Sequence, residues 1–505
     1  MSLALPKLRL PVSLRHLLPQ SSFVGCADIH VSDATEKSGE CEPNSLFAAI
    51  AGMNVDGNQF VEEAIGRGAT SLLVKNPLAG VSIAQCVVPN VRIAYAQLCE
   101  ALAGHPSRLM KVCGVTGTNG KTSVSWLIRS MLKSTGSRVG LLGTVEYSDG
   151  INVDPSGMTT PDAKTLAQWL AAMLLNRTSY AAVELSSHAL DQGRCAGTML
   201  DAAVVTNVTH DHFDYHGDYA AYLASKTRIL RQLKKGAAAV LNADDPGSTS
   251  MKTQVPASCE LITYGLQMPA DVSAEITQES LRGSRFTLRF DGKQAEICTP
   301  LIGRHNVSNC LAAAASAAHC GASMDDIAAG IESLASVPGR LERVDCGQMF
   351  DVFVDYAHTD DALRQCIRFV SGMTRGRVIC VFGAGGDRDR SKRPLLASAA
   401  SEADCVVVTS DNPRSEDPHD IIVDIFKGFD PGRADVHVEV DRAEAIGWAL
   451  EQAQPNDSVV IAGKGHETVQ VIGRERIPFD DREVVRGVLE RQTTHNIAHP
   501  VRMRA

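Results

Sequence analysis

The chain has 505 residues and a formal net charge of -9 at pH 7; 44% of its residues are hydrophobic, 21% are charged and 5% are aromatic. This composition is typical of a folded α/β protein and excludes a disordered or membrane protein, and the length predicts several hydrophobic cores. An acidic chain without a visible basic patch is not expected to bind nucleic acid. No apolar run reaches the roughly 20 residues of a membrane span, and prolines and basic residues interrupt the first segment. We therefore expect a cytoplasmic protein with neither a secretory signal nor a membrane partner.

The 14 cysteines are scattered from Cys26 to Cys405, with no CxxC pair and no spacing typical of a zinc site. We expect them to be reduced and mostly buried, as small hydrophobic side chains. A disulfide framework is not expected.

Turn-forming residues mark two boundaries along the chain, at His105–Ser107 and at Ser336–Arg340. They predict three domains, with residues 1–108, 109–337 and 338–505. We expect an α/β fold in which a central P-loop ATPase-type parallel sheet lies between a small amino-terminal α/β domain and a carboxyl-terminal Rossmann-like domain.

Short β-branched runs alternate with helical patterns from about Leu109 onward, which predicts parallel sheets covered by crossover helices. In the central domain the predicted strands are residues 111–115, 138–142, 180–185, 202–206 and 237–241. In the last domain they are residues 350–355, 377–382, 404–409 and 458–462. Ligands of such sheets bind beyond the carboxyl ends of the strands.

A phosphate-binding loop follows the first central strand. Residues 117–123 read GTNGKTS, and the apolar residues after them recur on one helical face, with Gly136 placed to end the helix. Such a strand, glycine turn and helix start aim backbone N–H groups at phosphate, with Lys121 as a point charge and the Thr122 hydroxyl available to magnesium. The alternative is a tight turn that merely contains glycines. The apolar helical positions are Val124, Leu127, Ile128, Met131 and Leu132.

Two later segments carry candidate metal ligands. Glu184 lies at the end of a predicted strand, where its carboxylate can reach a magnesium ion held by the phosphate loop. Its alternative role is that of a strand-end charge paired with a lysine. Further along, His210, His212 and His216 lie among aspartates, a density that makes zinc an alternative to magnesium.

The glycines at 114, 117 and 120 form a GxxGxxGKT spacing that resembles the loop of Mur ligases and folylpolyglutamate synthases. The resemblance extends through nearly the whole chain. It implies an amide ligase of peptidoglycan precursor synthesis in which ATP phosphorylates a carboxylate, an amine attacks the acyl phosphate, and phosphate leaves. It also implies that His212 binds a second magnesium ion and that Lys226 carries a carbamate made from CO2. Carboxylation would convert an ammonium into the anionic oxygen donor that magnesium prefers.

The resemblance assigns further residues to ATP. The segment from Gly303 resembles the one whose asparagines approach adenine, and Asn309 is the matching position. Arg340 matches a phosphate contact and Asp355 a ribose contact. The family usually has proline where this chain has Asp360, which we expect on a loop. The predicted ATP-binding residues are Gly117, Thr118, Asn119, Gly120, Lys121, Thr122, Ser123, Asn309, Arg340 and Asp355. The predicted catalytic residues are Lys121, Glu184, His212 and Lys226, and the predicted magnesium ligands are Thr122, Glu184, His212 and the Lys226 carbamate.

The sequence Asp411-Asn412-Pro413-Arg414 resembles the motif of Mur ligases that add meso-diaminopimelate. The distal end of that amino acid is a zwitterion, whose carboxylate suits arginine and whose ammonium suits a carboxylate. An ordinary Asx-Pro turn is the alternative for these four residues alone. The predicted diaminopimelate-binding residues are Arg388, Asp411, Asn412, Pro413, Arg414, Gly463 and Glu467.

The family binds UDP in its first domain through an Asp-Ser-Arg segment, which reads Lys37-Ser38-Gly39 in this chain, so only Ser38 matches. We expect a monomer that adds meso-diaminopimelate to UDP-N-acetylmuramoyl-L-alanyl-D-glutamate. The alternatives are a lysine-adding Mur ligase, a folylpolyglutamate synthase and a degenerate, non-catalytic relative. The predicted contacts of the UDP-muramoyl substrate are Ser38, Thr159, Thr160, Ser186, Gln192 and Arg194.

Overall fold

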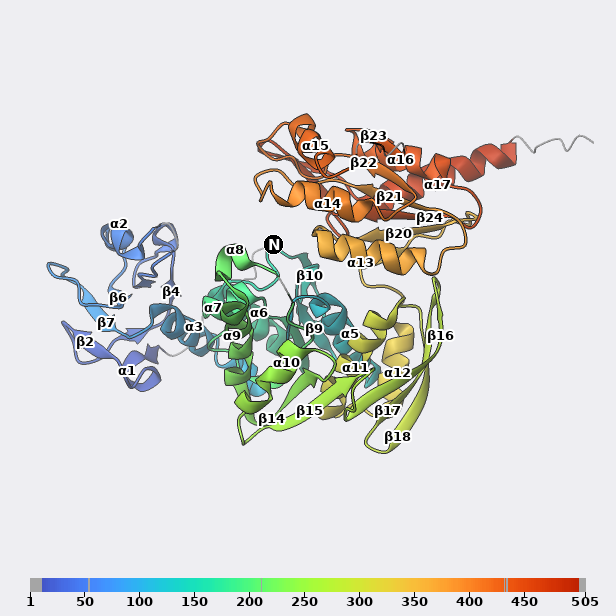
Figure 1. Cartoon of the computed structure of the whole chain (residues 1–505). Coiled ribbons are helices and arrows are strands. Elements are labelled where there is room, and N and C mark those ends of the chain that lie inside the picture. The colour runs from blue at the N-terminus through green and yellow to red at the C-terminus, as the bar shows by residue number, and fades with distance from the viewer. Residues whose placement is uncertain (1–10, 53–54, 210, 431, 433–434, 499–505) are drawn as a thin grey trace, which may run out of the picture. The chain divides into compact units, whose positions relative to one another are not determined.

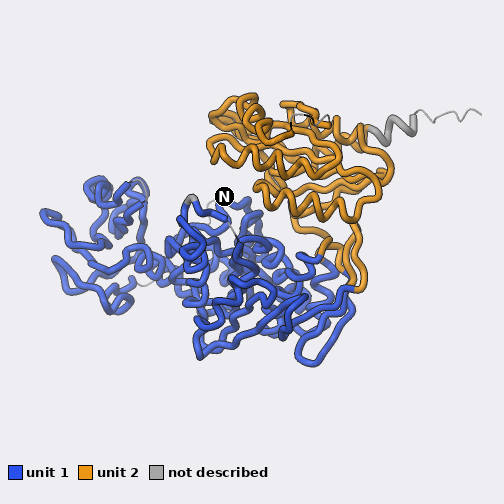
Figure 2. Tube along the Cα trace, in the orientation of Figure 1, with its two compact units in different colours: residues 1–276, 286–298, 304–333 blue, residues 277–285, 299–303, 334–505 orange. Residues whose placement is uncertain are grey.

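The computed structural model describes residues 11–52, 55–209, 211–430, 432 and 435–498. The chain divides into two compact units (Figure 2): unit 1 comprises residues 1–276, 286–298 and 304–333, and unit 2 comprises residues 277–285, 299–303 and 334–505. The last segment of unit 2 therefore begins close to the expected boundary at residue 337. Residues 1–108 belong to the same unit as the central sheet, and the division into three domains stays a prediction.

The amino-terminal part of unit 1 forms a small sheet with strand order β2-β7-β6-β5-β4. Its four strands from β7 to β4 pair in parallel, and β2 pairs antiparallel at the edge. Alanines of α6 (Ala163–Leu175) share a hydrophobic core with α1 and α3, which joins this sheet to the rest of unit 1. The elements are β1 (Val12–Ser13), α1 (Leu14–Leu17), β2 (Ser22–Val24), β3 (His30–Val31), β4 (Ala34–Thr35), η1 (Ser38–Glu40), β5 (Leu46–Ala48), η2 (Gly57–Phe60), α2 (Val61–Gly66), β6 (Ser71–Val74), β7 (Ala84–Val87) and α3 (Val91–Leu102).

The central sheet has 11 strands in the order β11-β10-β9-β12-β8-β13-β14-β15-β16-β17-β18 (Figure 1). It belongs to unit 1, except for residues 277–280, 283–285 and 299 of its last three strands, which are assigned to unit 2. Strands β9, β12, β8, β13, β14 and β15 pair in parallel. All five predicted central strands are confirmed. The strands are β8 (Lys111–Thr116), β9 (Val139–Leu142), β10 (Glu146–Ser148), β11 (Val153–Pro155), β12 (Tyr180–Glu184), β13 (Leu200–Val205), β14 (Leu233–Asn242), β15 (Glu260–Gly265), β16 (Val272–Ser280), β17 (Gly283–Phe290) and β18 (Lys293–Thr299).

Helices pack against this sheet through apolar stripes. The predicted face of α5 is buried, and Gly136 follows the helix end with a φ of 81°, as expected for a C-terminal stop. Helices α11 and α12 pack against α5. The helices are α4 (Pro106–Leu109), α5 (Lys121–Ser134), α6 (Ala163–Leu175), α7 (Ser187–Asp191), α8 (Phe213–His216), α9 (Tyr219–Thr227), η3 (Arg228–Gln232), α10 (Pro246–Ser250), η4 (Met251–Gln254), α11 (Arg304–His319) and α12 (Met324–Ser333).

Unit 2 contains a six-stranded sheet with the order β19-β20-β24-β21-β22-β23, in which only β19 pairs antiparallel. One core packs α13, α14 and α15 against it, and a second packs α16 and α17. The four predicted strands and the α/β fold class are confirmed. The elements are β19 (Glu342–Arg343), β20 (Asp351–Asp355), α13 (Asp360–Ser371), β21 (Val378–Phe382), α14 (Lys392–Ala400), β22 (Cys405–Val408), α15 (Pro418–Phe426), β23 (Val436–Val438), α16 (Arg442–Gln452), β24 (Ser458–Ala462), β25 (Val469–Ile472), β26 (Glu475–Pro478) and α17 (Asp481–Ala498).

One local expectation is wrong: Asp360 is the first residue of α13 and does not lie on a loop. Thr359 caps this helix, and its hydroxyl accepts a hydrogen bond from the Ala362 N–H. The first helical position suits proline because its missing N–H is not needed there, and it suits aspartate because of the helix dipole. The exchange of proline for Asp360 is therefore compatible with the same local fold.

All 14 cysteines are free, and nine of them are buried, which confirms the prediction of reduced, mostly buried thiols. Among the helices of the described ranges, none is both long enough and apolar enough to cross a bilayer.

Candidate functional site

The phosphate loop follows β8 and leads directly into α5. Gly117 and Gly120 have φ values of 150° and 86°, and a Cβ at Gly117 would lie 1.8 Å from the Thr206 hydroxyl. The Lys121 ammonium curls over the loop and donates to the carbonyl oxygens of Gly117 (2.9 Å) and Thr118 (2.8 Å). Only glycine tolerates both this close approach and these φ values, so the loop geometry explains the glycine spacing.

Glu184 ends β12, the strand beside β8, and its side chain is fully buried. Its carboxylate accepts hydrogen bonds from the Thr122 hydroxyl (3.1 Å), the Thr144 hydroxyl (2.8 Å) and the Thr144 N–H (3.0 Å). Within the described ranges it pairs with no lysine or arginine, so the structure does not support the alternative of a strand-end ion pair. Two hydroxyls and a carboxylate converge there, and magnesium prefers such oxygen donors.

Lys226 lies on α9 and is 1% exposed, so it is not one of the solvated lysines that helices commonly carry on their outer face. Its ammonium donates to the Gly117 carbonyl (2.8 Å) and lies 4.4 Å from the centre of the Tyr222 ring. Burial lowers the pKa of Lys226 well below its ordinary value, and the positive charge of Lys121 lowers it further, while Asp211 opposes the shift. The structure thus places this lysine directly against the phosphate loop.

His212 caps the start of α8 with a φ of 54°. Burial lowers its pKa to about 4, and His188, Lys121 and Lys226 lower it too, while Asp211 raises it. The imidazole is therefore neutral near pH 7 and can act as a metal ligand. His188, whose ring centre lies 4.8 Å from that of His212, was missed by sequence reasoning, and its position in the segment VELSSHALDQGR was the available signal.

The zinc alternative receives no support from the part of the chain that the structure describes. His210 lies outside the described residues, and so does the side chain of Asp214. Among the side chains that are described, no three histidine, cysteine, aspartate or glutamate residues form a group that could hold a metal ion. Of the predicted magnesium ligands, Thr122 and Glu184 offer oxygen atoms and His212 offers a ring nitrogen.

Four predicted contacts of the muramoyl substrate gather around the end of β12. The Thr160 hydroxyl donates to the Glu184 carbonyl (2.7 Å) and contacts the hydroxyl of Ser186, which caps α7. The Arg194 guanidinium donates twice to the Gln192 side-chain oxygen (3.0 and 2.7 Å) and once to the Thr160 carbonyl (3.3 Å). Hydroxyls, an amide and a guanidinium thus share one surface beside the candidate magnesium site.

Two further predicted contacts are placed differently. The Thr159 hydroxyl lies 3.2 Å from the Thr144 hydroxyl, which itself donates to Glu184. Ser38 lies in η1 and donates to the exposed Glu63 carboxylate (2.8 Å). Burial raises the pKa of the carboxyl of Glu36, two residues before Ser38, and the positive charge of Arg194 opposes this rise. The segment around Ser38 therefore approaches the Arg194 cluster, whereas the Ser38 hydroxyl itself is engaged elsewhere.

The predicted adenine, phosphate and ribose contacts are split between the units. Asn309 on α11 lies against the phosphate loop, since a Cβ on Gly120 would be 2.6 Å from its side-chain oxygen. In unit 2, Arg340 stacks on Tyr356, with the guanidinium carbon 4.7 Å from the ring centre. Asp355 accepts from the N–H groups of Leu341 (2.6 Å) and Ala357 (2.8 Å), and burial raises its pKa. An approach of these unit 2 residues to ATP stays a prediction.

The predicted diaminopimelate residues meet in unit 2, on loops that follow β21, β22 and β24. Arg414 is half-buried, and its guanidinium donates to the Gly386 carbonyl (2.6 Å). A Cβ at Gly385 would lie 3.0 Å from the Arg414 guanidinium and 3.6 Å from the Arg388 side chain, so both arginines flank this glycine. Loops at the carboxyl ends of neighbouring parallel strands are the expected place for a ligand.

The remaining residues of this set lie on the loops after β22 and β24. The Asn412 amide donates to the Glu467 carboxylate (2.8 Å). Gly463 has a φ of 112°, and a Cβ there would lie 2.7 Å from an Asp411 carboxylate oxygen. A Cβ on Gly386 would collide with the Pro413 carbonyl at 1.8 Å. The arginines and carboxylates of this set thus lie on neighbouring loops of one sheet, and side chains of opposite charge can together bind a zwitterion.

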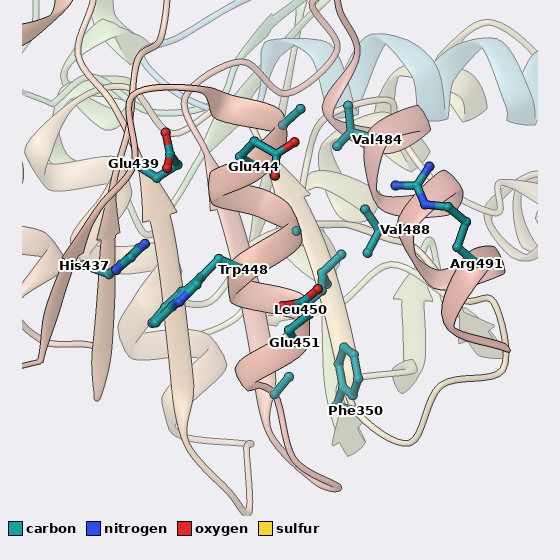
Figure 3. A pocket seen from close by; sticks show the side chains of 13 residues that line it. Phe350, His437, Glu439, Glu444, Trp448, Leu450, Glu451, Val484, Val488 and Arg491 are labelled. Atoms are coloured by element: carbon teal, nitrogen blue, oxygen red, sulfur yellow. The ribbon is translucent and has the colours of Figure 1, made fainter. Parts of the chain in front are cut away.

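A cavity of about 870 Å³ lies elsewhere in unit 2, between β23, α16 and α17 (Figure 3). His437 and Trp448 stack in its wall with ring centres 4.0 Å apart. None of the predicted site residues lines it. It is therefore not part of the candidate site.

Comparison with known proteins matches the two sheets to named domains. Residues 115–317 match the Mur ligase middle domain, and residues 339–465 match the Mur ligase, glutamate ligase domain. The chain is 42% identical over 455 residues to the UDP-N-acetylmuramoyl-L-alanyl-D-glutamate--2,6-diaminopimelate ligase of Geobacillus thermodenitrificans, which covers 89% of this chain and 92% of that relative.

Solved structures agree with this likeness. A UDP-N-acetylmuramoyl-L-alanyl-D-glutamate--2,6-diaminopimelate ligase superposes with a TM-score of 0.70 at 33% identity, covering 96% of this chain and 99% of that one. A folylpolyglutamate synthase of Mycobacterium tuberculosis, complexed with ADP and AMPPCP, superposes with a TM-score of 0.60 at 22% identity and covers 74% of this chain and 92% of its own. The synthase shows a likeness of fold alone, over a smaller part of the chain.

Proposed function

We propose, from the premise that this chain belongs to the Mur ligase family, that it joins meso-2,6-diaminopimelate to UDP-N-acetylmuramoyl-L-alanyl-D-glutamate and converts ATP to ADP and phosphate. The observation that carries this choice of amine is the group of Arg388, Arg414 and Glu467 on neighbouring loops of unit 2. Relatives of about 40% identity that match most of the chain bear the name of this ligase. The reaction belongs to the cytoplasmic stage of peptidoglycan precursor synthesis, where ATP is available, and a monomer can carry it out.

The residues around the phosphate loop fit the activation half of this reaction. Backbone N–H groups of the loop and the Lys121 ammonium bind the terminal phosphates of ATP. Thr122 and Glu184 would hold one magnesium ion, since their oxygens converge and the Glu184 carboxylate lacks a cationic partner among the described residues. Magnesium supplies neutralisation of the charge on the transferring phosphoryl group. The γ-phosphoryl then passes to the glutamate carboxylate, the amine displaces phosphate, and the leaving proton goes to solvent or a nearby base.

His212 and a carbamate on Lys226 would hold a second magnesium ion. Carbamate formation joins the lysine nitrogen to CO2 and releases one proton, so it requires the neutral amine. The burial of Lys226 and its nearness to Lys121, which lower its pKa, favour that neutral form. The neutral imidazole of His212 would leave a ring nitrogen available to bind the same magnesium ion.

One assay tests the proposed function. The protein is incubated with ATP, magnesium and UDP-N-acetylmuramoyl-L-alanyl-D-glutamate, and phosphate release is compared with diaminopimelate, with lysine and without an amine. We expect release with diaminopimelate well above both other reactions. Release with lysine alone would identify a lysine-adding ligase, and no release with any amine would favour a degenerate relative.

Arg414→Ala sharpens the test of specificity. We expect it to raise KM for diaminopimelate by about 10- to 100-fold, because a charge-assisted hydrogen bond to the distal carboxylate is lost. KM for ATP should stay within about twofold, since Arg414 is not predicted to touch the nucleotide. Equal losses for both substrates would contradict the assigned role.

A further inference from the structure

Lys464 is the most deeply buried lysine of unit 2, with a side chain that is 0% exposed. Its ammonium donates to the Asn412 side-chain oxygen (3.0 Å), the Glu467 carboxylate (3.0 Å) and the Val469 carbonyl (2.9 Å). An ammonium has three N–H donors, and all three are used inside the protein. Lys464 is therefore not placed to bind a substrate or to move a proton itself.

The same three bonds connect three separate loops. Asn412 belongs to the loop after β22, Glu467 to the loop after β24, and Val469 begins the β25–β26 hairpin. Asn412 also accepts from the Val471 N–H (2.9 Å), and the Val471 carbonyl accepts from the Arg414 N–H (3.0 Å). Hydrogen bonds thus connect the hairpin to the loops of the predicted amine site, and the Lys464 ammonium contacts all three segments.

These hydrogen bonds also distinguish the two carboxylate oxygens of Glu467. Its Oε2 accepts from both Lys464 and the Asn412 amide (2.8 Å), while the side chain stays 30% exposed. Within the described part of the chain, Oε1 has no hydrogen-bond partner. A carboxylate held through one oxygen presents the other in a fixed direction, and its partial exposure leaves that oxygen accessible to an incoming ammonium.

We propose that Lys464 is a positioning residue for the amine substrate: it holds Asn412 and Glu467 so that the free carboxylate oxygen receives the distal ammonium of diaminopimelate. This inference rests on the proposed function. It adds to that function a residue that touches no substrate but sets the affinity for one of them. Preorganisation of this kind reduces the cost of ordering side chains when the ligand binds.

The test is a double-mutant cycle in the phosphate-release assay. Lys464→Met keeps the length of the side chain and removes the donors, and we expect KM for diaminopimelate to rise at least tenfold with KM for ATP within twofold. Glu467→Gln alone should raise the same KM. If Lys464 acts by holding Glu467, Lys464→Met has little further effect in the Glu467→Gln background. Multiplying effects, or an equal rise of KM for ATP, would overturn the inference.

Lys427→Met is the matched control, because this lysine of unit 2 is 63% exposed and pairs with Asp424 within one helical turn. We expect no change in any KM. Should Lys464→Met fail to fold, Lys464→Gln keeps two of the three N–H donors on a shorter side chain, and a KM for diaminopimelate equal to that of the unaltered protein would then refute the inference. Inactivity of the unaltered protein with every amine would instead refute the proposed function, so the two failures are distinguishable.

Discussion

The chemistry of Lys226 depends on where the fold places it. In the sequence of α9 it occupies an ordinary helix position, and only the resemblance to Mur ligases identified it as a candidate site residue. The structure buries it against the Gly117 carbonyl and the Tyr222 ring. Burial of this kind arises from the packing of α9 on a loop about a hundred residues earlier in the chain, which no local pattern reports. By contrast, the places of Lys121 and Glu184 were predictable, because Lys121 follows a recognisable strand and loop and Glu184 ends a recognisable strand.

Lys226→Arg tests the carbamate at the scale of one residue. Arginine keeps a positive charge and can still donate to the Gly117 carbonyl, but it stays protonated and cannot react with CO2. We expect kcat to fall by at least about 100-fold, which is typical when one electrostatic contact to a transition state is lost. Phosphate release measures kcat, and carbon NMR with 13C-labelled bicarbonate should show a carbamate signal that the variant lacks.

Lys235→Arg serves as the control for this change, because Lys235 is exposed on β14. It should retain the activity and the carbamate signal of the unaltered protein. Full activity of Lys226→Arg would remove the carbamate from the mechanism, whatever the NMR spectrum shows.

Among the elements, the buried parallel strands were the most predictable. Strands such as β12, β21 and β24 are continuous apolar runs because helices cover both faces of their sheets. Strands β16, β17 and β18 were missed, since exposed and buried residues are mixed along them. A usable signal was present: Asp291-Gly292 joins β17 to β18 with φ values of 51° and 69°, as a two-residue hairpin turn requires.

Asp481→Ala tests a buried ion pair that joins the starts of α16 and α17. Arg442 donates to both carboxylate oxygens of Asp481 (2.7 and 2.8 Å), and both side chains are 0% exposed. Removal of the carboxylate leaves the guanidinium uncompensated in the core, so we expect a loss of about 3–5 kcal/mol in the free energy of unfolding. Urea denaturation followed by Trp448 fluorescence measures it.

The control in the same helix is Glu483→Ala, which removes the exposed pair with Arg486. It should cost less than about 1 kcal/mol, as exposed pairs do. An Asp481→Ala variant no less stable than Glu483→Ala would show that the buried pair does not hold the two helices.

For the whole molecule, the sequence indicated which motif belongs to which sheet. The phosphate loop follows a strand of unit 1, and the Asp411–Arg414 loop follows a strand of unit 2. Each motif could be assigned because it lies next to its own strand in sequence. The inclusion of residues 1–108 in unit 1 was not predictable, because it depends on core contacts of α6 with α1 and α3.

We expect denaturation of the whole molecule to show two transitions, since the two units have separate hydrophobic cores. Trp126 and Trp169 report on unit 1 and Trp448 on unit 2, so a Trp448→Phe variant isolates the first signal.

Magnesium-ATP at 100 times its Kd should stabilise unit 1 by about 2.7 kcal/mol, and diaminopimelate at the same excess should stabilise unit 2. Lys121→Ala should abolish only the ATP effect, and Arg414→Ala only the diaminopimelate effect. A diaminopimelate effect confined to the transition of unit 1 would mean that the Asp411–Arg414 loop is not the amine site.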